Sequence, residues 1–378
     1  MYILECWIEH PVMKLDRPFS YLSEEEVERG CRVAIDFNHQ QIIGFVENCF
    51  YSEENQEEIE ARLGMKLKFI QQVIDQHSLI THELHDLALW MAQETLSPVI
   101  ACFQTLLPSK IKPASGERKI VMERFIRPVD SEVSLTPKQA LAYEALCEKG
   151  EYKYSEFLKE YKSVVKTLIT KGVAECFEKE KAFVLQPLEN EGTMQTLTVL
   201  QQQVYETILT CPQQVVVLHG VTGSGKTEVY LHLAKKTIKE GRQVLFLVPE
   251  ISLTPQMVQR VKSRFGSEVA IYHSGLNAQE KYEQYQLVKQ HQVSVVVGTR
   301  SAIFMPFDEL GLIIMDEEHD TSYKQDKSPS YHCRDIAIHR AQHFNCKVVL
   351  GSATPSLETY ARAIKQVYGL AEMKERIN

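Results

Sequence analysis

The chain has 378 residues, of which 44% are hydrophobic and 24% charged, a composition typical of a soluble globular protein with about two or three domains. No apolar run reaches the ~18–20 residues of a membrane-spanning helix, which excludes a membrane protein. The formal net charge is −8, which argues against a protein that coats nucleic acid non-specifically through a strongly basic surface. The acidity is concentrated at one end, because residues 1–110 carry 18 acidic and eight basic side chains.

The cysteines predict the redox state of the protein. There are nine of them, an odd number, and no two have the C-x-x-C spacing of a zinc ribbon. Charged residues interrupt the short apolar start at 1–6, so it is no secretory signal. We therefore expect reduced thiols in a cytoplasmic protein and no zinc ligands in this chain.

The first region, residues 1–108, is predicted to be a small β-rich domain. Gly30, Asn38 and His39 supply turn residues between its short strands. The predicted elements are strands at 2–8, 32–37 and 42–46, an acidic loop or helix at 53–60, and a helix at 84–93. A stretch with two prolines, two serines and a glycine at 108–116 predicts a linker.

The second region, residues 117–190, reads as a smaller domain of three helices and a hairpin. Thr136 followed by Pro137 predicts a helix start, and Gly172 predicts a helix end. The expected elements are helices at 138–149, 154–161 and 164–171, and hairpin strands at 173–178 and 182–185. This order is typical of a winged-helix domain that binds DNA. A small α+β adaptor that binds no nucleic acid fits the same pattern.

The third region, residues 191–378, has a different pattern. Continuous apolar runs at 215–219, 244–248, 293–297, 312–315 and 347–350 alternate with helical segments. Strands without polar alternation are buried on both faces, which is typical of a parallel sheet covered by helices. The predicted fold class is therefore multidomain α/β.

A phosphate-binding loop follows the first of these runs. The segment GVTGSGKT fits G-x-x-x-x-G-K-[ST] between a strand and a helix, and its candidate residues are Gly220, Gly223, Ser224, Gly225, Lys226 and Thr227. Its glycines let backbone N–H groups turn toward phosphate oxygens at the start of a helix. Lys226 is expected to reach the β and γ phosphates of ATP, and the Thr227 hydroxyl to hold Mg²⁺.

Further residues at strand ends complete a nucleotide site. The run at 312–315 ends in Asp316 and Glu317, for which we expect Mg²⁺ binding and polarisation of the attacking water, respectively. The segment GSATP at 351–355 is either a simple turn or a sensor of the γ-phosphate. Gln201 lies upstream of the phosphate loop, where it either contacts adenine or belongs to a solvated helix face.

These motifs in this order resemble the first, RecA-like motor lobe of superfamily 2 helicases, and more narrowly the bacterial PriA-type family of replication-restart helicases. The resemblance rests on GVTGSGKTEVY at 220–230, LVPEISLTPQ at 247–256, HSGL at 273–276, GTRSAIFMPF at 298–307, DEEHDTSYKQ at 316–325 and GSATPSLE at 351–358. In the first region, LDRPFSY at 15–21, GCRV at 30–33 and LWMA at 89–92 resemble the family's 3′-end DNA-binding domain.

The resemblance implies DNA-binding roles for residues of the motor lobe. Thr254 and Arg300 match positions that grip the DNA backbone. Tyr323, Lys324, Gln325 and Tyr331 fall in the family's aromatic-rich loop, which couples DNA contact to ATP hydrolysis. Aromatic and cationic side chains suit stacking on single-stranded bases. Without the family, both tyrosines are equally compatible with ordinary loop packing.

In the 3′-end domain the resemblance implies a pocket for the terminal nucleotide. The Phe19 ring would stack on the terminal base, Gly30 would let the protein backbone approach the DNA end closely, and Lys68 would supply one positive charge. The family has Asp after this Phe where the chain has Ser20, a neutral and weaker acceptor for a 3′-hydroxyl. The alternative is that Phe19 is a core residue of a small β domain.

By resemblance, the chain is the N-terminal part of an ATP-dependent 3′→5′ helicase: a 3′-end domain (1–108), a winged helix (117–190) and motor lobe 1 (191–378), without the second lobe or the zinc-binding region. Implied partners are branched forks, single-stranded DNA, primosome loading proteins and single-stranded-DNA-binding protein.

Two other functions are compatible with the sequence. One is a module that binds forks and ATP but does not move along DNA, and the other is a nucleotide kinase. The DEEH and SAT strand ends disfavour the kinase.

Overall fold

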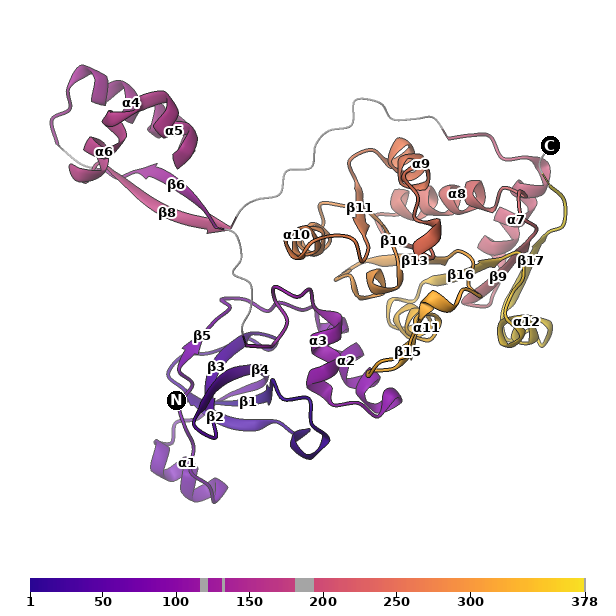
Figure 1. The fold of residues 1–378 in the computed structure, drawn as a ribbon, viewed down its shortest axis with the longest axis horizontal. Coiled ribbons are helices and arrows are strands. Elements are labelled where there is room, and N and C mark those ends of the chain that lie inside the picture. The colour runs from indigo at the N-terminus through magenta and orange to yellow at the C-terminus, as the bar shows by residue number, and fades with distance from the viewer. Residues whose placement is uncertain (116–121, 131–132, 181–193, 377–378) are drawn as a thin grey trace. The chain divides into compact units, whose positions relative to one another are not determined.

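The computed structural model describes residues 1–115, 122–130, 133–180 and 194–376. They form two compact units, one made of residues 1–117 together with 185–378 and the other of residues 118–184. Figure 1 shows the chain coloured from the N-terminus to the C-terminus. Within these residues, no helix is both long and apolar enough to cross a bilayer.

The first region is built on an antiparallel five-stranded sheet (Figure 1). Its strands, in spatial order, are β2 (Phe19–Ser23), β1 (Tyr2–Ile8), β4 (Gln40–Tyr51), β3 (Arg32–Phe37) and β5 (Gln72–Val73). Alternate side chains such as Leu4, Cys6 and Val33 are buried in one core. Strand β2 was not predicted, because it is short and Pro18 precedes it; it pairs with β1 over its whole length.

Helices flank this sheet and confirm most of the predicted pattern. They are α1 (Gln56–Leu63), α2 (His82–Thr95) and α3 (Val99–Leu106), after a 3₁₀ turn at Met13–Leu15. The acidic segment is a helix because Asn55 and Glu58 form a capping box and Gly64 ends it in the left-handed conformation. Helix α3 was missed: its eight residues lie between Pro98 and Pro108, and no element was predicted there.

The unit of residues 118–184 carries the three predicted helices, α4 (Pro137–Lys149), α5 (Tyr154–Tyr161) and α6 (Ser163–Thr170). They enclose a small core around Leu146, Phe157 and Leu168. Its sheet has the order β7 (Tyr152–Lys153), β6 (Met122–Pro128), β8 (Ala174–Glu180). Strand β8 pairs with β6, upstream of the helices, whereas the predicted hairpin partner at 182–185 lies outside the described residues.

The third region is built on a parallel sheet, as predicted, and this sheet has seven strands (Figure 1). Its strands, in spatial order, are β11 (Val269–Tyr272), β12 (Val295–Gly298), β10 (Gln243–Leu247), β13 (Leu310–Met315), β16 (Lys347–Ser352), β9 (Val215–Gly220) and β17 (Gly369–Met373). Strands β11 and β17 were not among the predicted runs. Because both faces are covered, the strands need no polar alternation.

Helices and short turns connect these strands. The helices are α7 (Val199–Thr210), α8 (Lys226–Lys239), α9 (Pro255–Phe265), α10 (Ala278–Lys289), α11 (Cys333–Phe344) and α12 (Leu357–Ile364). The 3₁₀ turns are η2 (Glu250–Ser252), η3 (Arg300–Phe304) and η4 (Thr321–Tyr323), and a two-stranded ribbon joins β14 (Lys324–Gln325) to β15 (Tyr331–His332). Side chains of α7, α8 and α9 share one core with the sheet.

The first region and the parallel lobe pack against each other within one unit. The Trp90 ring of α2 stacks on His339 of α11, with ring centroids 4.0 Å apart and an interplanar angle of 14°. The Tyr285 hydroxyl of α10 donates a buried hydrogen bond of 3.0 Å to the Leu79 carbonyl. These contacts join segments more than 200 residues apart.

Candidate nucleotide site

The phosphate loop has the backbone that its glycines predict. It runs from the end of β9 to the first residue of α8, and Gly223 and Gly225 have φ values of 81° and 79°, in the left-handed region. Gly220 is required for space instead, since a Cβ there would lie 2.9 Å from Ser224 Oγ. Ser224 Oγ is itself buried and has no hydrogen-bond partner among the described residues. This hydroxyl could therefore donate a hydrogen bond to a phosphate oxygen bound in the loop.

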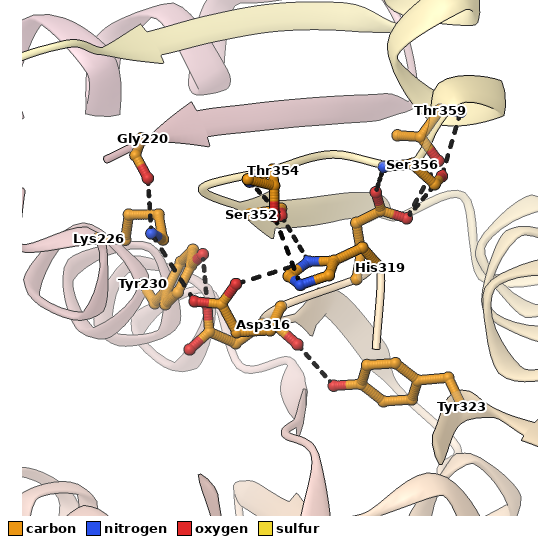
Figure 2. Close-up of polar contacts among 12 residues, drawn as sticks. Gly220, Lys226, Tyr230, Asp316, His319, Tyr323, Ser352, Thr354, Ser356 and Thr359 are labelled. Atoms are coloured by element: carbon orange, nitrogen blue, oxygen red, sulfur yellow. Dashed lines mark hydrogen bonds and ion pairs between the residues drawn. The ribbon is translucent and has the colours of Figure 1, made fainter. Parts of the chain in front are cut away.

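Lys226 lies between the phosphate loop and the acidic strand end (Figure 2). Its ammonium group donates a hydrogen bond of 2.7 Å to the Gly220 carbonyl and lies 4.0 Å from Glu317 Oε1. The residue is only 8% exposed. The sequence places these groups 91 positions apart, and the parallel sheet brings them to one edge because β9 and β13 both end there.

Asp316 is held by two tyrosine hydroxyls, one on its carboxylate and one on its backbone carbonyl. Its Oδ1 accepts a hydrogen bond of 3.1 Å from the Tyr230 hydroxyl, and its carbonyl accepts one of 2.7 Å from the Tyr323 hydroxyl (Figure 2). Burial, and next the negative charge of Glu317, raise the pKa of Asp316 to about 6. Glu317 itself has a φ of 45°, a strained left-handed backbone for a residue with a Cβ.

The SAT strand end is tied to the acidic motif by His319. Its Nδ1 lies 2.7 Å from Ser352 Oγ, and its Nε2 lies 3.5 Å from Thr354 Oγ1 (Figure 2). Glu318 is a structural residue, because its buried carboxylate accepts hydrogen bonds from the Ser356 backbone N–H and the Thr359 hydroxyl at the start of α12. A γ-phosphate sensor at 351–355 stays a prediction, and the contacts of His319 with Ser352 and Thr354 connect that segment to the acidic motif.

The donor groups fit a bound Mg²⁺. Asp316 and Glu317 are adjacent carboxylates, and the raised pKa of Asp316 is that of a buried acid without enough positive charge nearby. Among the described residues no group of three His, Cys, Asp or Glu side chains could hold a metal by itself. In proteins Mg²⁺ typically uses one or two carboxylates and takes phosphate oxygens and waters for the rest. Asp316 and Thr227 would supply the protein ligands.

Gln201 is buried and braces the phosphate loop. Its side-chain oxygen accepts a hydrogen bond of 2.9 Å from the Thr198 N–H in a capping box, and its amide donates one of 3.2 Å to the Gly225 carbonyl. The alternative of a solvated helix face is therefore wrong for this residue, which is 3% exposed. Its contact with adenine stays a prediction.

The aromatic-rich loop differs from the prediction. Tyr323 is fully buried and Tyr331 is 8% exposed, so the expected stacking of the Tyr323 ring on DNA bases is wrong for this structure. The half-buried Arg300 guanidinium donates hydrogen bonds of 3.3 and 2.5 Å to the carbonyls of Ser322 and Lys324, so it holds the start of the loop. The sequence left both tyrosines open between base stacking and loop packing, and their burial, which depends on the fold, agrees with loop packing.

The remaining predicted DNA contacts of the lobe lie at its surface. The Thr254 hydroxyl accepts a hydrogen bond from the Met257 N–H and thereby caps α9. Lys324 is exposed and lies 3.2 Å from Asp326 Oδ1, and the Gln325 amide donates to the Pro329 carbonyl. Contacts of these three residues with DNA stay predictions.

The predicted 3′-end pocket is brought together in part. Phe19 is half-buried, with the Arg17 guanidinium 5.2 Å from its ring centroid and the Phe37 ring 5.2 Å away edge-on. Lys68 pairs with the Asp36 carboxylate at 2.5 Å. Ser20 is next to Phe19 on β2.

Gly30 lies apart from that cluster. A Cβ on Gly30 would lie 2.5 Å from Ser78 Oγ and 2.7 Å from Ile80 Cγ2, and none of the cluster residues is among these neighbours. The need for glycine there is explained by close packing and by a φ of 85°. A role in DNA binding stays a prediction without a geometric reason.

Comparisons with known proteins agree with this arrangement. Residues 7–108 match the family model of the 3′ DNA-binding domain of PriA, and residues 198–363 match that of the DEAD/DEAH box helicases. The replication restart protein PriA of Bacillus subtilis is 33% identical over 462 aligned positions, which cover 100% of this chain and 56% of that protein. The chain belongs to the PriA family of replication restart proteins.

Two further PriA proteins extend the comparison. That of Haemophilus influenzae is 36% identical over 91% of this chain and 48% of its own length. That of Synechocystis is 48% identical over 52% of this chain and 24% of its own length. The chain thus spans about half the length of the PriA proteins that it matches over most of its residues.

Several residues of the site were missed by sequence reasoning, Tyr230 above all. A signal was present, because a residue four positions after Lys226 lies one turn further along the same face of α8. The partner that such a side chain meets depends on the order of the strands, and the sequence motifs do not contain that order.

Proposed function

We propose that this chain provides the ATP-binding lobe and the 3′-end-binding domain of an ATP-dependent 3′→5′ DNA helicase. The enzyme would recognise stalled or repaired forks and initiate primosome assembly. The observation that carries the proposal is the convergence of three motifs at the ends of β9, β13 and β16, which are neighbours in one parallel sheet. The proposal is also supported by the distance of 4.0 Å between Lys226 Nζ of the phosphate loop and Glu317 Oε1 of the acidic strand end.

The roles of the residues follow from their charges and positions. Lys226 would leave the Gly220 carbonyl to neutralise the β and γ phosphates, and the loop N–H groups and Ser224 hydroxyl would hold phosphate oxygens. Glu317 would accept a hydrogen bond from the attacking water and orient it. Bound Mg²⁺, held through Asp316 and Thr227, would offset charge on the transferring phosphate.

The DNA substrate is proposed from the first domain and from family membership. The edge-on ring pair of Phe19 and Phe37 would offer an aromatic face, and Lys68, which pairs with Asp36, would offer a cation for the end of one strand. A broad electrostatic contact is disfavoured there, because residues 1–110 have ten more acidic than basic side chains. Single-stranded DNA, primosome loading proteins and single-stranded-DNA-binding protein are proposed partners, and the cytoplasm is the proposed location.

A second candidate function is a fork- and ATP-binding fragment without motor activity. It is favoured by one observation, the single parallel sheet of the helicase fold among the described residues. In two-lobed motors an arginine from the second lobe stabilises the transferring phosphate, and in related systems such an arginine is worth about 10³–10⁵ in rate. Residues 1–378 are therefore expected to bind ATP, to hydrolyse it slowly and not to unwind duplex DNA.

The test compares ATP binding, ATP hydrolysis with and without forked DNA, and strand separation by the chain. The helicase assignment expects Mg²⁺-dependent ATP binding and hydrolysis stimulated by forks. Robust strand separation by residues 1–378 would overturn the second candidate, and absence of nucleotide binding would overturn both.

A further inference from the structure

Tyr230 connects the phosphate-loop helix to the acidic strand end. It lies on α8 four residues after Lys226 and is fully buried, with its ring edge-on to Phe246 at a centroid distance of 5.5 Å. Its hydroxyl lies 3.1 Å from Asp316 Oδ1 (Figure 2). A phenol is protonated at neutral pH, so the hydroxyl donates and the carboxylate accepts.

Gly351 makes room for this hydrogen bond. A Cβ at that position would lie 1.6 Å from the Tyr230 hydroxyl oxygen and 2.8 Å from the ring carbon that carries it. It would also lie 3.4 Å from Asp316 Oδ1. Gly351 has no left-handed backbone that would require glycine, so the steric reason stands alone. Three motifs, from α8, β13 and β16, therefore meet at one hydroxyl group.

A carboxylate next to a bound cation works best when its rotation is fixed by an outer hydrogen bond. We propose that Tyr230 is a positioning residue, which orients the Asp316 carboxylate for Mg²⁺–nucleotide, and that Gly351 is the position that admits it. The inference rests on the proposed function. Tyr230 touches neither phosphate nor water in this role; it acts through Asp316 alone.

The experiment measures binding of a fluorescent ATP analogue to the chain as a function of Mg²⁺ concentration and, separately, in a chelator without Mg²⁺. In Tyr230→Phe, the Mg²⁺ concentration that half-saturates the metal-dependent gain in affinity should rise about 10-fold, the size typical of losing an outer partner of a metal ligand. Affinity without metal should stay within about 2-fold, because the phosphate loop is intact. An unchanged Mg²⁺ dependence would overturn the proposal.

A matched control separates positioning from stability. Tyr285 is also a buried tyrosine of this lobe, and its hydroxyl donates to a backbone carbonyl far from the phosphate loop. Tyr285→Phe should lower the melting temperature and leave the Mg²⁺ dependence unchanged. If Tyr285→Phe shifted the Mg²⁺ dependence as much as Tyr230→Phe, the effect would be one of general stability and the proposal would fail.

A second variant tests whether Gly351 and Tyr230 act through the same hydrogen bond to Asp316. Gly351→Ala should push the hydroxyl away from Asp316 and raise the Mg²⁺ requirement in the same way. In the Tyr230→Phe background the Cβ still meets the ring carbon at 2.8 Å, but the hydrogen bond is already absent, so the two shifts in Mg²⁺ requirement should sum to less than full additivity. Full additivity of the two shifts would contradict the proposal. If Gly351→Ala does not fold, Tyr230→Phe, which removes one atom, carries the test.

The outcomes also distinguish this inference from the proposed function. If the unmodified chain shows no Mg²⁺-dependent nucleotide binding, the nucleotide site itself is wrong. If it shows such binding and Tyr230→Phe behaves identically, only the positioning role of Tyr230 is overturned.

Discussion

Arg340 and Glu83 form a buried, two-pronged ion pair across 257 positions of sequence, with Nε–Oε1 and Nη2–Oε2 distances of 2.9 and 2.7 Å. Arg340 is 0% exposed and Glu83 6%. The same guanidinium donates to the carbonyls of Ile303 and Met305, which follow the strand that leads to Arg300. One side chain therefore ties α2 of the 3′-end domain to α11 and η3 of the helicase lobe.

Arg340→Met should destabilise the chain by about 3–5 kcal/mol, because it leaves the Glu83 carboxylate buried without its partner. Urea unfolding followed by circular dichroism measures the effect. The double variant Arg340→Met with Glu83→Leu should recover part of the loss, since no charge is then left unpaired. A single change that costs less than about 1 kcal/mol would show that the pair is not desolvated.

Lys226→Ala should reduce ATP turnover by roughly 10²–10³-fold and weaken nucleotide binding, because it removes the cation that faces the transferring phosphate. Fluorescence titration and phosphate release measure the two effects. Lys235→Ala is the matched control, since Lys235 is an exposed lysine of the same helix. Equal binding and turnover in both variants would remove Lys226 from the site.

Glu47 predicts a pH dependence of stability. Burial opposes its ionisation, but the His85 imidazole 3.1 Å away and hydrogen bonds from Trp7 and Arg29 outweigh burial and lower the pKa of Glu47 to about 2. A lowered pKa stabilises the fold above the unfolded value of 4.5, and this contribution is lost as pH falls from there toward about 2. A shift of this size is worth about 3 kcal/mol at neutral pH.

Glu47→Gln should therefore unfold more easily at pH 7 and lose less further stability between pH 5 and pH 3 than the unmodified chain. Tryptophan fluorescence during urea unfolding is a direct readout, because Trp7 donates a hydrogen bond of 2.7 Å to this carboxylate. Glu57→Gln, at an exposed position of α1, should leave the profile unchanged. Identical acid profiles for Glu47→Gln and the unmodified chain would refute the assignment.

Ser20→Asp should sharpen the preference for a free 3′-hydroxyl, by roughly 5-fold in affinity ratio, because a carboxylate accepts a hydrogen bond more strongly than a neutral hydroxyl. Forks that end in 3′-hydroxyl and 3′-phosphate are compared. Phe19→Ala should cost about 1–3 kcal/mol of binding by loss of stacking. Equal affinity for both ends, with no loss in a folded Phe19→Ala chain, would support the reading of Phe19 as a core residue.

Elements that depend on neighbours in sequence could be predicted. Helix α5 has the expected bounds, and α4 begins at Pro137 after Thr136, because caps, turns and periodicity act within a few residues. The parallel sheet followed from its continuous apolar runs, and the phosphate loop from glycines whose backbone the structure places in the left-handed region. The chemistry of the loop was equally local, since one strand end and one helix start build it.

Contacts that depend on which distant segments meet were decided by the tertiary structure. Sequence alone leaves Tyr323 as a stacking or a packing residue; the fold buries it against the Asp316 carbonyl. It also pairs β8 with β6 upstream of the helices, and brings Tyr230 to Asp316 through the space left by Gly351. The physical reason is that burial and hydrogen-bond partners are set by strand order and domain packing, which no short motif encodes.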